Sequence, residues 1–209
     1  HFHILMPHCA ALAFFDYLRE HGMNVCFSNP GTSEMPLLEA MGQGNEWNTI
    51  LCLHENVATG AADGFARMGP GLVLLHLGAG VANGLTNIHN AWQAGSDMLV
   101  VAGEIATTHK GKGSVLETDI QLCSKWAHAA HFAIETANAV SQIAFQACSH
   151  KGLSLITFPQ DIQAQIVDVG SLLSAPTFET EGCKETGEPQ KAAPLAAETA
   201  LKSSMTAGL

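Results

Sequence analysis

Short apolar segments alternate with longer stretches of helical pattern from about residue 7 to residue 168, and this alternation strongly constrains the fold. The apolar segments have the length of strands and are nearly continuous in apolarity, which is typical of strands buried on both faces of a parallel sheet. They cover Asn24 to Ser28, Thr49 to Leu53, Gly71 to His76, Met98 to Gly103 and Gly152 to Phe158. Helices are expected near 7–21, 33–42, 55–67, 81–94 and 136–150. We therefore predict an α/β fold with a doubly wound, mostly parallel sheet flanked by helices.

The composition indicates a large core and a thin polar shell. Apolar residues make up 47% of the chain and charged residues only 13%, which favours an oligomer that covers part of the surface. The formal net charge is -10 with nine Lys and Arg in total, so a nucleic-acid partner is not expected. No stretch approaches the roughly 18 apolar residues of a membrane span.

The six cysteines are scattered and form no CxxC pair. We interpret them as thiols of a reducing compartment, either the cytoplasm or an organellar lumen such as that of a plastid or mitochondrion, and not as disulfides of a secreted protein. The eleven histidines show no metal-ligand spacing either, so no metal site is predicted in this chain. The cysteines are Cys9, Cys26, Cys52, Cys123, Cys148 and Cys183.

The composition changes after Asp168. Residues 170–192 are rich in Ser, Thr, Pro, Gly, Glu and Lys, which is typical of a linker. A weak helical pattern follows over Pro194 to Met205, and a lone helix has nothing to pack against. We expect one domain over 1–168, and over 169–209 a linker with the start of a truncated middle domain.

Two turns that contain glycine follow apolar segments. The first is Asn29-Pro30-Gly31-Thr32-Ser33, where Thr32 or Ser33 is expected to cap the next helix. The second is Gly78-Ala79-Gly80, which opens another helix. Because the carboxyl ends of parallel strands meet at one edge of a sheet, both turns are expected where open α/β sheets bind ligands.

Glu55 stands where an apolar segment runs directly into a helix of small residues. One interpretation is a first-turn acid that is favoured by the helix dipole. The other is a functional carboxylate, because His76, Thr32 and both glycine turns should project from the same edge of the sheet. The convergence of an imidazole, hydroxyl groups and a carboxylate favours a ligand site.

The Gly78-Ala79-Gly80-Val81-Ala82-Asn83 segment also has features of a dinucleotide fingerprint, with Glu104 downstream to hold a ribose. Asn83 occupies the place of the third glycine, however, where close packing of helix on strand needs no side chain. A dinucleotide-binding oxidoreductase is therefore the third of the functions we consider, after the two given below. No G-x-S-x-G elbow and no Walker-type phosphate loop occurs in the sequence.

Four stretches taken together resemble the N-terminal, pyrimidine-binding domain of thiamine diphosphate-dependent enzymes, closest to acetolactate synthase large subunits and benzoylformate decarboxylase. They occur in the family's order and spacing over roughly residues 5–168. The stretches are Phe27 to Pro36, His54 to Arg67, His76 to Ala91 and Phe158 to Gln163.

The resemblance implies thiamine diphosphate as cofactor, a small 2-oxo acid as substrate, and decarboxylation or carboligation as the reaction. Glu55 would be catalytic, because a carboxyl group that shares a proton with the N1' nitrogen of the aminopyrimidine favours its imino tautomer. His76 would be catalytic and close to the substrate, which Thr32 would also face. The cofactor-binding residues besides Glu55 would be Pro30, Gly31, Gly78, Gly80 and Asn83.

The family holds the diphosphate and its Mg²⁺ through a separate domain with Gly-Asp-Gly and Asn-rich motifs, which this sequence lacks. The resemblance therefore implies a diphosphate-binding domain or subunit as partner, in a homo- or hetero-oligomer, and no activity of this chain alone. FAD is expected only if a middle domain exists. The alternative is a non-catalytic structural or interaction subunit derived from the same domain.

Overall fold

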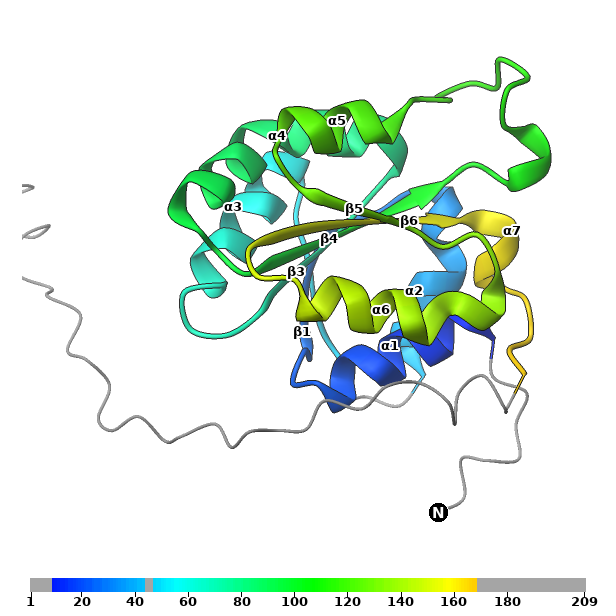
Figure 1. Cartoon of the computed structure of the whole chain (residues 1–209), viewed down its shortest axis with the longest axis horizontal. Coiled ribbons are helices and arrows are strands. Elements are labelled where there is room, and N and C mark those ends of the chain that lie inside the picture. The colour runs from blue at the N-terminus through cyan, green and yellow to red at the C-terminus, as the bar shows by residue number, and fades with distance from the viewer. Residues whose placement is uncertain (1–8, 44–46, 169–209) are drawn as a thin grey trace, which may run out of the picture. The chain divides into compact units, whose positions relative to one another are not determined.

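Six parallel strands form one sheet with helices on both faces in the computed structural model, which describes residues 9–43 and 47–168 (Figure 1). The strand order is β2-β1-β3-β4-β6-β5. The α/β prediction is confirmed. The strands are β1 (Val25–Asn29), β2 (Asn48–Leu51), β3 (Gly71–Leu75), β4 (Met98–Glu104), β5 (Ala130–Ala133) and β6 (Leu153–Pro159). The helices are α1 (Ala10–Glu20), α2 (Met35–Gly42), α3 (Glu55–Phe65), α4 (Leu77–Ala94), α5 (Ile120–Trp126), α6 (Val140–Ser149) and α7 (Gln160–Gln163).

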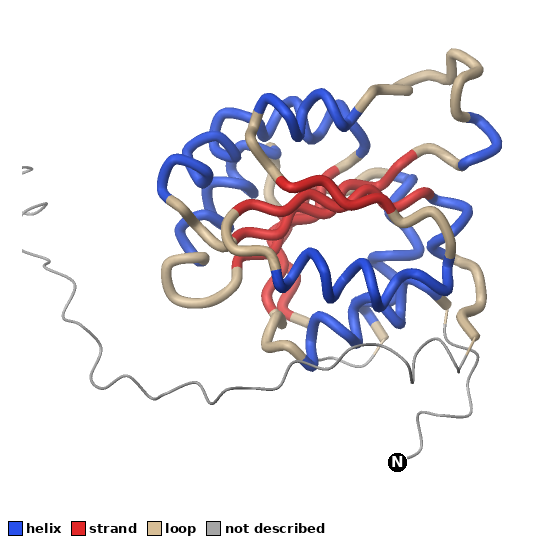
Figure 2. Tube along the Cα trace, in the orientation of Figure 1, coloured by secondary structure: helices blue, strands red, loops and turns tan. Residues whose placement is uncertain are grey.

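The sheet separates two apolar cores (Figure 2). On one face α1, α2 and α6 pack around Phe14, which makes an edge-to-face contact with Phe158 of β6. On the other face α3, α4 and α5 cover the strands, with Val81 and Ile88 of α4 fully buried. Strands β3 and β6 are buried along their whole length, as their continuous apolar sequences predict.

The chain changes direction across the sheet between β1 and β3. These two strands are neighbours, but β1 leads through α2 to β2 at the edge, whereas β3 leads through α4 to β4 on the other side. In open α/β sheets, ligands bind outside the carboxyl ends of two strands whose connections diverge in this way. Both glycine turns of the sequence analysis follow these two strands, so the topology brings them together.

Three elements were not expected from the sequence, namely β5, α5 and the four-residue α7 that directly follows β6. Strand β5 is only four residues long and lies partly exposed at the sheet edge, so its sequence lacks the continuous apolarity of the inner strands. Helix α5 has seven residues, too few for a clear helical period. Strand β5 and helix α5 both lie between β4 and α6, a region without a predicted element.

Two local predictions were wrong. Residues 78–80 lie in the first turn of α4 and not in a loop, because the change of direction is made one residue earlier by Leu77, whose φ is 50°. Neither Thr32 nor Ser33 caps a helix. A short 3₁₀ turn, η2 (Thr32–Glu34), begins there, and the side chain of Glu34 accepts the Gly31 N–H in place of a hydroxyl cap.

Residues 169–209, with the expected linker, the Pro194 to Met205 helix and Cys183, lie outside the described residues, so the domain boundary stays a prediction. Among the residues that the structure describes, no helix combines the length and apolarity that a membrane crossing requires.

Candidate functional site

The carboxylate of Glu34 is completely buried at the carboxyl ends of β1 and β3. Its Oε2 accepts the Gly31 N–H at 2.8 Å and lies 2.8 Å from Nδ1 of His76. Its Oε1 accepts the Leu77 N–H at 3.4 Å. When the carboxylate is ionised it can only accept, so the His76 Nδ1 carries the proton and Nε2 remains for other partners. Glu34 therefore fixes the ring of His76, which is a quarter exposed.

Two glycines make room for this pair. A Cβ on Gly103 at the end of β4 would lie 1.8 Å from Glu34 Oε1, and a Cβ on Gly31 would lie 2.3 Å from His76 Nδ1. No real Cβ approaches another atom so closely. The backbone at Gly31, after β1, thus packs directly on His76, and the backbone at Gly103, within β4, packs directly on Glu34. This close packing explains why glycine stands at positions 31 and 103.

Glu55 is the first residue of α3 and is half-buried. The helix is capped by His54, whose ring Nδ1 accepts the Asn56 N–H at 3.0 Å. The Glu55 Oε2 accepts a hydrogen bond from Asn83 Nδ2 of α4 at 3.3 Å. The carboxylate therefore lies between the beginnings of α3 and α4, where both helix dipoles favour a negative charge.

Gly80 lies between the carboxylate of Glu55 and the side chain of His76. A Cβ built there would be 3.6 Å from both Glu55 Oε1 and His76 Cβ. Of the residues predicted to form the site, the structure thus brings together Glu55, Asn83, Gly80, His76 and Gly31.

Two predicted residues, Gly78 and Glu104, have other surroundings, whereas Pro30 and Thr32 flank Gly31. Gly78 is buried against the loop after β4, where its Cβ would lie 2.4 Å from Thr118 Cβ, so it does not face Glu55. Pro30 is half-buried in the turn after β1, and the exposed Thr32 follows Gly31. Glu104, which a dinucleotide interpretation assigns to a ribose, is paired with Lys110 at 3.1 Å.

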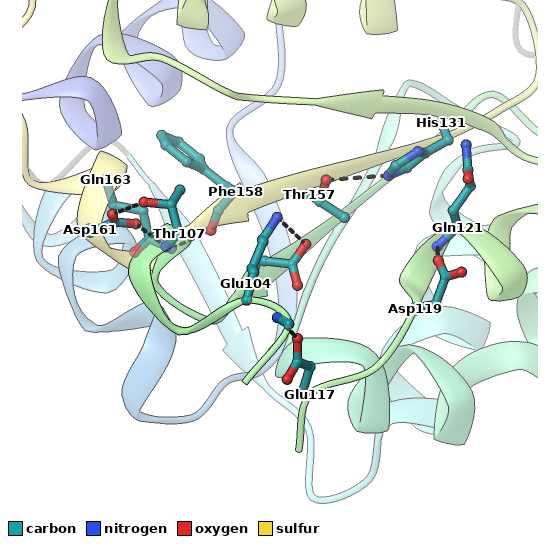
Figure 3. A network of polar contacts seen from close by, with 12 residues as sticks. Glu104, Thr107, Glu117, Asp119, Gln121, His131, Thr157, Phe158, Asp161 and Gln163 are labelled. Carbon is teal, nitrogen blue, oxygen red and sulfur yellow. Dashed lines mark hydrogen bonds and ion pairs between the residues drawn. The ribbon is translucent and has the colours of Figure 1, made fainter. Parts of the chain in front are cut away.

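The loop between β4 and α5 packs on Gly78 through Thr118, and Figure 3 shows the polar contacts that hold it. The Thr107 N–H donates to Asp161 Oδ1 at 3.0 Å, and its hydroxyl donates to Oδ2 at 2.5 Å. Partial burial acts to raise the pKa of Asp161, but the hydrogen bonds from Thr107, together with those from the backbone N–H groups of Asp161 and Ile162, outweigh it and hold this pKa below its usual value. Hydrogen bonds from the N–H groups of Gly111 and Ser114 likewise lower the pKa of Glu117. These hydrogen bonds therefore hold the loop between β4 and α5 in place against Gly78.

Glu34 is the functional residue that the sequence analysis missed. It was quoted within the Phe27 to Pro36 stretch without a role. The signal was its spacing: a Glu three residues after the first residue of a turn can fold back on the backbone N–H at that position, as in a capping box. The structure shows this contact to Gly31.

Across residues 9–43 and 47–168, no group of three or more His, Cys, Asp or Glu residues could hold a metal ion. The described cysteines are free thiols. Burial raises the pKa of Cys26 to about 12, so this thiol stays protonated and unreactive at neutral pH.

The sequence of residues 9–124 matches the profile of a protein family described as "Thiamine pyrophosphate enzyme, N-terminal TPP binding domain". The chain belongs to this family. Thiamine pyrophosphate is the same compound as thiamine diphosphate, so the recognition made from the sequence is confirmed.

Named relatives agree with this assignment. A Mycobacterium tuberculosis protein named as acetolactate synthase large subunit IlvX is 50% identical over 53% of this chain and 22% of its own length. Benzoylformate decarboxylase of Pseudomonas aeruginosa is 34% identical over 76% of this chain and 31% of its own length. An X-ray structure from Mycobacterium smegmatis, titled a thiamin diphosphate-dependent enzyme, is 24% identical, has a TM-score of 0.71, and covers 77% of this chain and 32% of the other. The solved structure supports the fold. The chain spans about a fifth to a third of the length of these proteins.

Proposed function

We propose that this chain supplies the half of an active site that activates the aminopyrimidine ring, in a complete protein that decarboxylates or ligates 2-oxo acids with thiamine diphosphate. The observation that carries the proposal is the position of Glu55, a carboxylate at the beginning of α3 whose Oε1 is directed toward the side-chain-free Gly80. When bound, the cofactor supplies a carbon nucleophile and an electron sink for decarboxylation.

The residues of this chain fit such a ring. Glu55 provides an acceptor that can share a proton with the N1' nitrogen, and Gly80 leaves space beside it. Pro30 and Gly31 would line the same ring, and Gly78 would support the turn through its contact with Thr118.

The substrate would lie beside His76. Glu34 holds the imidazole through Nδ1, so Nε2 can accept a proton from, or donate one to, a group of the substrate. The exposed hydroxyl of Thr32 could hydrogen-bond the carboxylate of a 2-oxo acid. His76 and Thr32 are thus our candidates for substrate contacts.

The cofactor's diphosphate and Mg²⁺ would be held by another domain or subunit. The apolar side chains next to Glu55 support a partner there, because Leu53 is 93% exposed and Val57 of α3 is 59% exposed. The relatives are three to five times longer than the segment they share with this chain, which also supports further domains. A flavin would require a middle domain. We place the assembly in the cytoplasm or in a reducing organellar lumen.

The test compares Glu55→Gln with Glu39→Gln in the complete protein. Glu39 is exposed on α2, so its substitution is a matched control for the loss of a carboxylate. We expect the parent and E39Q to bind thiamine diphosphate with Mg²⁺ in calorimetry and to exchange the C2 proton of the bound cofactor at equal rates. E55Q should slow this exchange on the order of 10²- to 10⁴-fold. Exchange by E55Q at the parental rate would disprove the assignment, and no cofactor binding by the parent would favour the structural subunit.

A further inference from the structure

The α3–α4 contact holds the backbone of Glu55 at a fixed place relative to α4. The Thr59 hydroxyl on α3 is 3.3 Å from the Gly84 carbonyl oxygen, and a Cβ on Gly84 would come within 2.8 Å of the Thr59 side chain. One turn further, Asn87 Nδ2 donates to the Asn56 carbonyl oxygen at 2.6 Å. The two helices are therefore in close contact just beyond Glu55.

With the backbone fixed, the carboxylate of Glu55 can still rotate about its side-chain torsions. In the described part of the chain, Asn83 is the one residue whose side chain hydrogen-bonds this carboxylate. Asn83 is itself exposed and contributes no core packing. The bond to the amide uses Oε2 and leaves Oε1 on the side of Gly80.

We propose that Asn83 is a positioning residue, which holds Oε2 of Glu55 so that Oε1 is the oxygen presented to the pyrimidine nitrogen. This inference rests on the proposed function. The sequence analysis placed Asn83 among the cofactor-binding residues, whereas the geometry gives it an indirect role through Glu55. An amide suits this role, because it donates at every pH and cannot compete for the shared proton.

The first test removes the hydrogen-bond donor with one variant of nearly the same size, Asn83→Asp, and with one apolar variant, Asn83→Leu. Asn83→Leu and Asn83→Asp both remove the donor at neutral pH, and Asn83→Gln keeps one. The matched control is Asn90→Leu, because Asn90 is also exposed on α4 and its amide bonds only Asn87, at 3.0 Å. The complete protein is loaded with thiamine diphosphate and Mg²⁺. The readouts are cofactor affinity, the circular dichroism bands of the bound amino and imino tautomers, and C2-proton exchange.

We expect N83L and N83D to lower the imino signal and to slow C2-proton exchange about 10- to 100-fold at neutral pH, because a misdirected carboxylate loses its alignment. N83Q should recover part of the rate, and N90L should equal the parent. Cofactor affinity should change less than exchange, because most binding contacts are made elsewhere.

The pH dependence distinguishes the loss of a hydrogen-bond donor at position 83 from a steric effect of the new side chain. The new carboxylate of N83D lies beside Glu55, and two adjacent carboxylates favour sharing one proton. As the pH falls, this proton restores a donor, so the rate of N83D relative to the parent should rise while that of N83L should not. The imidazole rings of His54 and His76 lie near this carboxylate pair, and N83L retains both rings, so N83L is the reference for any contribution they make.

The outcomes distinguish this inference from the proposed function. If E55Q abolishes the imino signal but N83L equals the parent, Asn83 positions nothing and the inference is wrong. Equal defects of N83L and N83D at every pH would also overturn the donor role. If the parent binds no cofactor, the proposed function fails and this inference fails with it.

Discussion

The buried carboxylate of Glu34 accepts hydrogen bonds from two turns that lie far apart in the sequence. Gly31 follows β1, and His76 and Leu77 follow β3, so a single side chain connects the carboxyl ends of these two strands. Because the group is fully buried, each of its bonds replaces contacts with water that cannot re-form in the folded protein.

We expect Glu34→Gln to destabilise the protein by about 1.5–3 kcal/mol, the usual value of hydrogen bonds to a charged group. Glutamine has the same size, but its NH₂ group must face either the Gly31 N–H or the Leu77 N–H. That backbone N–H then has no acceptor. Urea unfolding of the parent and E34Q measures the difference. Glu39→Gln is the control and should change the free energy of unfolding by less than about 0.5 kcal/mol. A stability of E34Q equal to that of the control would show that the carboxylate is not required.

At this scale the sequence predicted which polar residues lie at the binding edge but not how they pair. Glu55 and His76 were found because Glu55 stands two residues after one apolar segment and His76 is the last residue of another. For Glu34, local spacing could predict the contact with Gly31, but not the space for its carboxylate, which Gly103 leaves 69 positions later in the chain. Local spacing carries no information about such a distant contact.

Among the elements, β5 and β6 are joined at the sheet edge by the side chains of His131 and Thr157, whose Nε2 and Oγ1 are 3.2 Å apart (Figure 3). Partial burial disfavours the charged ring and lowers the pKa of His131 below its usual value. In the unfolded chain a histidine titrates near about 6.5, so between this pH and the lower folded pKa the unfolded state binds more protons. The contribution of His131 to stability is therefore present above pH ~6.5 and is lost as the pH falls through the folded pKa.

We expect His131→Gln to remove this loss of folding stability at low pH. The glutamine amide can still hydrogen-bond Thr157. The measurement is the free energy of unfolding of parent and variant at a series of pH values from about 8 to 5. The parent should lose more stability than H131Q below about pH 6.5, and the two curves should run parallel above it. Parallel curves over the whole range would contradict the interpretation.

The inner strands were predictable, and of the two edge strands β2 was predicted and β5 was not. The expectation that the β2 segment is buried on both faces was wrong, because β2 has a single neighbour and all four of its residues are exposed. Strands β3 and β6 are buried on both faces, so their sequences carry the continuous apolar signal that strand prediction needs. Strand β5 has a single neighbour and is partly exposed, so its short Ala-His-Phe-Ala sequence carries no such signal. The start of α4 was placed too late because Gly78 and Gly80 are typical of a loop, whereas here they allow the first helical turn to approach its neighbours closely.

For the molecule as a whole, the proposed function predicts that the diphosphate-binding partner packs on the exposed apolar side chains beside Glu55. Leu53 is 93% exposed at the carboxyl edge of the sheet beside Glu55, and Met68 is 84% exposed in the turn before β3, at the opposite edge. Only the first position lies where a cofactor shared with another domain would be enclosed. Leu53 and Met68 are similar in size and exposure, so a substitution of Met68 is a matched control for the same substitution of Leu53.

We expect Leu53→Asp to weaken assembly of the complete protein with its diphosphate-binding partner, and Met68→Asp to leave it unchanged. Burying a leucine side chain contributes about 1.5–3 kcal/mol, so the apparent dissociation constant should rise about 10- to 100-fold in L53D. Sedimentation velocity gives the assembly, and calorimetry gives the affinity for thiamine diphosphate with Mg²⁺, which should fall in parallel. Because both positions are exposed within this chain, neither variant should lower its thermal stability by more than about 0.5 kcal/mol. Equal effects of the two substitutions, or none for L53D, would place the partner elsewhere on the surface.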